Sequence, residues 1–155
     1  MSNDQQEQLI QEVAHAIFAL QNATDKVDEV VAERLGINRT DLRCLGLLSV
    51  EGPLTAGELA KKSELSPGAI TTAIDRLERA GYARRVRDRQ DRRSVSVEAT
   101  EAALHLLDEL YGPIAAAGMA SLSGYSQEEL NILLDFLRAG CALQEDHATR
   151  IRDGT

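Results

Sequence analysis

The stretch SPGAITTAIDRLERAGYARRVRDRQDRRSVSV, residues 66–97, decides the fold of this chain. It opens with Ser66 and Pro67, a capping hydroxyl followed by proline at the first helical position, which is a strong helix start. Apolar residues then recur at helical spacing until Gly81 ends the helix. The residues expected to be buried are Ile70, Ala73, Ile74 and Leu77. An arginine-rich tip and a period-two Ser-Val-Ser-Val run then predict a hairpin, with strands over 82–87 and 94–97.

A shorter helix is predicted immediately before this stretch. Thr55 and Glu58 have the spacing of a capping box, so a helix over 56–62 is expected. A turn at 63–65 joins it to the helix that starts at Ser66. Two helices joined by so short a turn form a helix-turn-helix, and the hairpin adds a wing.

An amphipathic helix is predicted at the N-terminal end, over residues 4–36, because its apolar residues follow in steps of three and four. The run Asn-Ala-Thr-Asp at 22–25 is a point where this helix could break or kink. After Gly36, we expect Thr40 to cap a helix over 41–50.

Two more helices are predicted after the wing. Thr100 caps the first, in which Gly112-Pro113 could introduce a kink or interruption, and Ser126 caps the last. The apolar stripes of the terminal helices have no obvious partner inside so small a core. We therefore expect the terminal helices to bury these stripes in a dimer.

The fold class predicted is mainly α with a small β-hairpin wing. Residues 1–155 form one subunit, in which a winged helix-turn-helix over 40–98 is flanked by dimerisation helices over 4–36 and 100–150. The expected assembly is a homodimer.

Charge is distributed unevenly along the chain. The net charge is −8, yet residues 53–98 hold ten basic and seven acidic residues, and residues 76–93 hold eight arginines against three acidic residues. Screening confines electrostatic fields to about 10 Å, so a local basic patch matters more to a phosphate backbone than the total charge. The sequence therefore predicts double-stranded DNA as a partner, bound on one face.

Several other classes of protein are disfavoured by the sequence. Two cysteines, Cys44 and Cys141, make no disulfide framework, and no apolar run has the length of a signal peptide or a membrane span. We expect a cytoplasmic protein with no membrane association. His15, His105 and His147 are scattered, and no catalytic motif occurs, so no metal, cofactor or enzymatic activity is expected.

A set of motifs through the central region carries a family resemblance. They are Thr40-Asp41-Leu42-Arg43, Gly52-Pro53-Leu54-Thr55, Glu58-Leu59-Ala60, Ser66-Pro67, Thr71, Asp75-Arg76-Leu77-Glu78, Gly81, Arg85, Asp88, Asp91-Arg92-Arg93 and Thr100. The chain resembles the multiple-antibiotic-resistance regulators, the MarR family of bacterial transcription factors. Ala99 and Ala103 stand where members usually have Leu and Gly, a departure that affects local packing rather than the DNA-reading residues.

The second helix of the helix-turn-helix is predicted to enter the major groove. Small residues at its start permit close approach to base pairs, which present distinct donor and acceptor patterns there. Arg76 lies one turn beyond Thr72 and is expected to reach the groove or its wall. The residues of the helix-turn-helix predicted to contact DNA are Thr55, Ser66, Pro67, Gly68, Thr71, Thr72 and Arg76.

The resemblance implies that the wing tip enters the adjacent minor groove. In this interpretation Arg93 is inserted while Asp91 holds its guanidinium in position. Phosphate contacts position a protein without specifying sequence. The arginines expected to make them are Arg84, Arg85, Arg87, Arg89 and Arg92. For Arg85 an alternative stays open, in which it pairs with Asp75 and braces the helix against the wing.

The resemblance also implies a small phenolic or anionic effector, bound between the dimerisation helices and the winged region. The candidate ligand-binding residues are His15, Phe18, Arg43, Cys44 and Leu47. The sequence thus predicts a dimeric, ligand-responsive repressor of a pseudo-palindromic operator. Two alternatives remain: a cysteine-based redox-sensing regulator of the same fold, and a winged-helix protein-interaction module without DNA binding.

Overall fold

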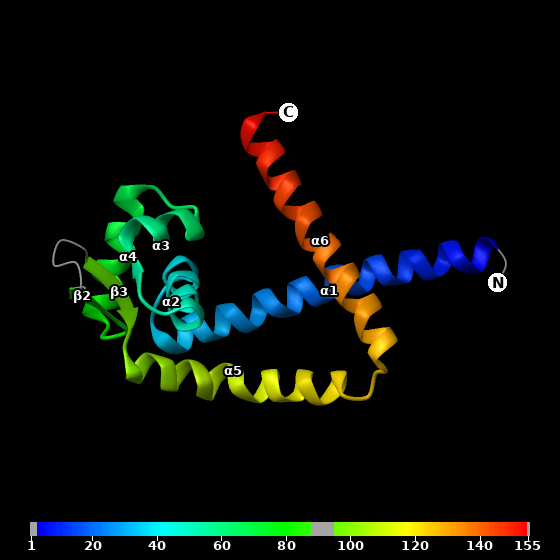
Figure 1. Ribbon diagram of the computed structural model, residues 1–155, viewed down its shortest axis with the longest axis horizontal. Coiled ribbons are helices and arrows are strands. Elements are labelled where there is room, and N and C mark those ends of the chain that lie inside the picture. Colours follow the sequence, from blue (N-terminus) through cyan, green and yellow to red (C-terminus); the bar gives the residue numbers. More distant parts are fainter. Residues whose placement is uncertain (1–2, 88–94, 155) are drawn as a thin grey trace. The chain divides into compact units, whose positions relative to one another are not determined.

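The computed structural model describes residues 3–87 and 95–154, and it confirms a mainly helical chain with a small sheet (Figure 1). Its helices and strands, in chain order, are α1 (Asn3–Leu35), α2 (Arg39–Glu51), β1 (Leu54–Thr55), α3 (Ala56–Ser63), α4 (Pro67–Arg79), β2 (Ala83–Arg87), β3 (Val95–Ala99), α5 (Glu101–Leu122) and α6 (Gln127–Asp153). The chain divides into two compact units, Met1–Leu110 and Tyr111–Thr155, so the boundary lies inside α5.

The core of the first unit lies among α2, α3 and α4. The predicted apolar stripe of α4 is confirmed, since Ile70, Ala73, Ile74 and Leu77 are all buried. Leu45 and Leu48 of α2 and Leu59 of α3 are buried with them. Burying a side chain of this size stabilises a fold by about 1.5–3 kcal/mol. Three short helices thus hold each other in a fixed arrangement.

The wing is part of a three-stranded antiparallel sheet with the order β1-β3-β2. In the hairpin, Ala83 pairs with Ala99 and Arg87 with Val95. The sequence missed β1, whose Leu54 pairs with Val97. A two-residue strand has no periodic pattern of its own, and it exists here only because β3 supplies its hydrogen bonds. This pairing ties the wing to the start of α3.

The side chains of Tyr82 and Thr100 form hydrogen bonds at the base of the wing. The hydroxyl of Tyr82 donates a hydrogen bond of 2.9 Å to the Leu35 carbonyl at the end of α1. Thr100 caps α5 as predicted, accepting a hydrogen bond from the Ala103 N–H at 3.2 Å. The same hydroxyl donates to the Gly81 carbonyl at 2.8 Å. Thr100 therefore closes the base of the wing, and Tyr82 attaches that base to the end of α1.

One predicted helix cap requires correction, and neither of the two possible helix breaks occurs. Asn38 rather than Thr40 caps α2, because its backbone is extended and its side chain accepts from the Asp41 N–H. Helix α1 runs without a break through 22–25, where the Thr24 hydroxyl donates to the Leu20 carbonyl at 3.0 Å. Helix α5 continues through Pro113, since the residues after it, including three consecutive alanines, favour helix.

Each unit presents apolar side chains that its own residues leave uncovered. On α1 the exposed apolar residues are Leu9, Ile10, Val13, Ile17, Phe18, Leu20 and Val30. On α6, where no residue is buried, they are Leu130, Ile132, Leu134, Phe136, Leu137, Leu143 and Ile151. Within residues 3–87 and 95–154, no helix combines the length and apolar character needed to cross a membrane.

Candidate nucleic-acid interface

A residue in the left-handed conformation shapes the turn between α3 and α4. Glu64 adopts the left-handed conformation with φ 57°, and the N–H groups of Glu64 and Leu65 cap the end of α3 by donating to its last carbonyls. Ser66 then caps α4, its hydroxyl oxygen accepting from the Ala69 N–H at 3.2 Å, and Pro67 occupies the first turn. The sequence predicted the Ser66 cap and the place of Pro67 because both depend on residues within three positions.

The outer face at the start of α4 consists of small residues. Pro67, Gly68, Thr71 and Thr72 are all exposed. The Thr71 hydroxyl donates to the Pro67 carbonyl at 2.9 Å, and the Thr72 hydroxyl donates to the Gly68 carbonyl at 3.0 Å. The surface is narrow and uncharged, so it permits close approach of this helix to a groove wall or floor.

Thr55 is engaged in the capping box predicted for α3. Its hydroxyl oxygen accepts from the Glu58 N–H at 3.2 Å and its own N–H donates to the Glu58 carboxylate at 2.8 Å. The backbone bond from Thr55, aided by the Thr55 hydroxyl, lowers the pKa of Glu58. Thr55 therefore has a structural role in addition to its predicted contact with DNA.

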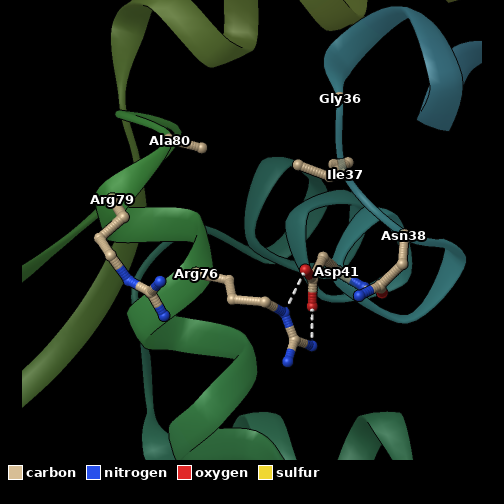
Figure 2. Close-up of a pocket in the computed structure, with 7 residues that line it drawn as sticks. All are labelled: Gly36, Ile37, Asn38, Asp41, Arg76, Arg79 and Ala80. Atoms are coloured by element: carbon tan, nitrogen blue, oxygen red, sulfur yellow. Dashed lines mark hydrogen bonds and ion pairs between the residues drawn. The ribbon is translucent and has the colours of Figure 1, made fainter.

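Arg76 does not extend freely from α4. Its Nε and Nη2 donate to the two carboxylate oxygens of Asp41 at 2.7 and 2.6 Å, joining α4 to the first turn of α2 (Figure 2). These hydrogen bonds raise the pKa of Arg76 above its usual value. The Asp41 side chain is only 2% exposed, whereas that of Arg76 is 37% exposed. The sequence missed this pair, since an aspartate in a first helical turn usually serves the helix dipole alone.

A shallow hollow of about 340 Å³ lies beside this ion pair (Figure 2). Its lining comes from the α1–α2 connection, the first turn of α2 and the last turns of α4. The lining residues are Gly36, Ile37, Asn38, Asp41, Arg76, Arg79 and Ala80. The hollow therefore lies at the far end of α4 from Ser66.

Arg85 of the wing is bound to α4 by two carboxylates. Its Nη2 lies 2.8 Å from Asp75 Oδ1, and its Nη1 forms an ion pair with Glu78. The Arg85 N–H also donates to Glu78 at 3.0 Å. The predicted contact with Asp75 is thus confirmed, while Glu78 was not foreseen. Arg84 pairs with Glu98 across the hairpin at 2.6 Å, so part of the basic patch is neutralised locally.

Comparison with known proteins identifies the family of this chain. The model of the MarR family matches residues 37–95. An HTH-type transcriptional regulator of Bacillus subtilis, the uncharacterized YcgE, is 36% identical over 124 residues, which make up 80% of this chain and 80% of that protein. The chain belongs to the MarR family. It is a DNA-binding transcriptional regulator and not an enzyme, as the sequence predicted.

Solved MarR-family structures share the fold of this chain at low identity. MepR of S. aureus, solved in complex with DNA, is 18% identical with a TM-score of 0.56, over 79% of this chain and 98% of that one. NadR, solved in complex with 4-hydroxyphenylacetate, is 21% identical with a TM-score of 0.60, over 82% of this chain and 90% of that one.

The MarR-type wing tip lies outside the described residues. It includes four of the predicted DNA-binding residues, Arg89, Asp91, Arg92 and Arg93. The minor-groove contact expected of them therefore remains a prediction. The described part of the wing ends at Arg87 and resumes at Val95.

The predicted effector residues of this MarR-family chain differ in their exposure. His15, Phe18 and Arg43 are exposed, Leu47 is half-buried and Cys44 is fully buried. Within the described residues no hydrogen bond or ion pair joins any of the five to another, and none of them lines the hollow beside Arg76. Phe18 is 65% exposed in the single chain. Burial raises the pKa of the Cys44 thiol.

Proposed function

We propose that this chain is one subunit of a homodimeric repressor that binds a pseudo-palindromic operator and releases it when a small phenolic or anionic molecule binds. The observation that carries the proposal is the exposed, uncharged start of α4, held by the core and attached to a basic wing. A helix with this surface can approach base edges in the major groove, while its N-terminal N–H groups can meet a phosphate.

The uncovered apolar residues of α1 and α6 support the homodimer. Monomeric proteins rarely expose contiguous apolar surface beyond a few hundred Å². A second copy offers an apolar surface of the same chemistry, and a two-fold dimer would place two α4 helices about one DNA turn, roughly 34 Å, apart. The operator would then consist of two inverted half-sites.

The effector proposal draws on the family's fold rather than on a cavity of this chain. NadR was solved with 4-hydroxyphenylacetate, a molecule both phenolic and anionic. Such a ligand would cause release only by binding more tightly to a dimer whose helix spacing does not fit DNA. Addition of 4-hydroxyphenylacetate should therefore weaken operator binding. The redox alternative receives no support from Cys44, since burial raises its pKa and disfavours the reactive thiolate.

The test is selection of DNA fragments by the full chain, followed by titration of the selected fragment at several salt concentrations. We expect tight binding of an inverted repeat and a steep loss of affinity with salt, because phosphate contacts release counterions. Replacing Arg93 by Ala should weaken binding by about 1–3 kcal/mol. Failure to enrich any sequence, with affinity independent of salt, would instead favour the protein-interaction module.

A further inference from the structure

The side chains at the start of α4 have few hydrogen-bond donors to offer to bases. A hydroxyl has one hydrogen, and those of Thr71 and Thr72 are directed to the carbonyls of Pro67 and Gly68. A carbonyl cannot donate, so the threonine must be the donor in each bond. What each threonine retains for a partner is its γ-methyl group and the lone pairs of its oxygen.

The arginines of α4 lie in its second half. Arg76 is bound through Nε and Nη2 to the buried carboxylate of Asp41. Arg79 lies in the last turn, where its Nε donates to the Asp75 carbonyl at 3.2 Å. The first half of α4 holds no Arg, Lys, Asn or Gln. The commonest specific contact with DNA, a bidentate pair from Arg or Lys to guanine, therefore has no side chain positioned for it on this half.

Ser66 is the other hydroxyl at this end of the helix, and its geometry suits a phosphate. Its oxygen accepts from the Ala69 N–H, which leaves its hydrogen for an acceptor. As the N-cap, it sits where the N–H groups of the first turn also point outward. Contacts of this kind position a protein on DNA but carry no sequence information.

Methyl groups and the threonine oxygens are the remaining means of specific recognition on this surface, and the methyl groups suit one base in particular. Ala69 is exposed beside the two threonines and presents a β-methyl group. Of the four bases, only thymine places a methyl group, at C5, in the major groove, and Ala and Thr methyl groups are its usual apolar partners. We propose that α4 reads its half-site through thymine C5-methyl groups packed against Ala69, Thr71 and Thr72, and not through arginine–guanine pairs. This rests on the proposed function, in which α4 lies in the major groove.

The test replaces single thymines of the selected operator by deoxyuridine, which removes the C5-methyl group and leaves the base-pairing edge unchanged. Burial of one methyl group corresponds to about a fourfold change in affinity. We expect at least one thymine in each half-site to show a loss of about this size. Deoxyuridine at positions outside the half-sites should leave the affinity unchanged.

Two matched variants of Thr72 assign the effect to the side chain. Thr72→Ser keeps the hydroxyl and loses the γ-methyl group, whereas Thr72→Val keeps a γ-methyl group and loses the hydroxyl. We expect Thr72→Ser to weaken binding about fourfold and to abolish the sensitivity to deoxyuridine at one thymine, while Thr72→Val stays sensitive. The same pair at Thr71 should report on a second thymine. Both side chains are exposed, and circular dichroism would verify that the variants fold.

The outcomes separate this inference from the proposed function. If an operator is selected but no thymine is sensitive to deoxyuridine, the inference is wrong and the proposed function stands. Loss of affinity with 7-deazaguanine, abolished in Arg76→Ala, would show that Arg76 leaves Asp41 and reads guanine instead. If the chain selects no DNA sequence, the proposed function fails and this inference fails with it.

Discussion

Arg76 of α4 and Asp41 of α2 form a two-bond ion pair across 35 positions of sequence, with donor–acceptor distances of 2.7 and 2.6 Å. The two partners are unequal, because the aspartate side chain is almost fully buried while the arginine remains partly exposed. The pair joins the helix proposed to read DNA to the helix that follows the α1–α2 connection. Among the described residues only Arg76 pairs with this buried carboxylate, so the ion pair adds a polar link to the apolar packing of α4.

The unequal burial of Asp41 and Arg76 predicts which substitution destabilises the fold more. Asp41→Asn removes the buried charge at nearly constant volume, and we expect the free energy of unfolding to fall by about 1–3 kcal/mol in urea denaturation. Arg76→Ala leaves the Asp41 carboxylate buried without a cation, so it should destabilise the fold more than Asp41→Asn does. Arg79→Ala, on the exposed side of the same helix, is the control. Equal unfolding midpoints for Arg76→Ala and Arg79→Ala would contradict this assignment.

The sequence predicted the features of this fold that depend on near neighbours. The caps at Thr55, Ser66 and Ser126 were found because each involves a partner three residues away. The buried stripe of α4 was found because helical periodicity reports burial directly. The hairpin was also predicted, although β3 extends to Ala99, two residues beyond the expected end.

Two of the misses depend on contacts between distant segments of the chain. Nothing near Asp41 indicates that Arg76 compensates its charge, and nothing in Leu54 indicates that it pairs with Val97. Tertiary context decided these positions, as it does wherever local preferences are weak.

The ion pairs of Arg85 predict that its replacement weakens DNA binding while changing stability little. Arg85 connects the wing to α4 through Asp75 and Glu78, but it is partly exposed, and exposed ion pairs stabilise proteins by about 0–1 kcal/mol. Arg85→Ala should therefore change the unfolding free energy little while weakening operator binding, because the wing loses its fixed position on α4. Arg84→Ala, which breaks only the pair with Glu98 inside the hairpin, is the control. Equal binding losses for the two variants would show that Arg85 acts as a general positive charge.

The capping box of α3 predicts a pH-dependent contribution to stability. The Thr55 N–H lowers the pKa of Glu58 below its ordinary value of 4.5, so the unfolded chain binds the proton more readily. The stabilisation is present above about pH 4.5 and is lost as the pH falls through the lower pKa of the folded state. Thermal unfolding should show Glu58→Gln less stable than the parent at pH 6, with a difference that shrinks below pH 4. A difference independent of pH would exclude the charged form as its source.

The two cysteines should differ sharply in reactivity. Cys44 is fully buried and burial raises its pKa, while Cys141 is exposed on α6 in the single chain. In Cys141→Ser, where Cys44 is the remaining thiol, we expect 5,5′-dithiobis-(2-nitrobenzoate) to react at least about tenfold more slowly with the folded protein than with the unfolded protein. Equal rates would show that Cys44 is accessible and would revive the redox alternative.

The apolar residues of α6 predict how the proposed dimer can be dissociated. Leu137 is 57% exposed in the single chain, and Asp135, two positions away, faces the opposite side of the helix. If α6 packs on a second copy, Leu137→Lys places a charge in that interface and should shift the mass in sedimentation equilibrium from twice 16.9 kDa towards the single-chain value. Asp135→Lys, the matched control on the other face, should remain dimeric. A Leu137→Lys variant that stays fully dimeric at micromolar concentration would place the interface elsewhere on the chain and would remove α6 from the proposed dimerisation surface.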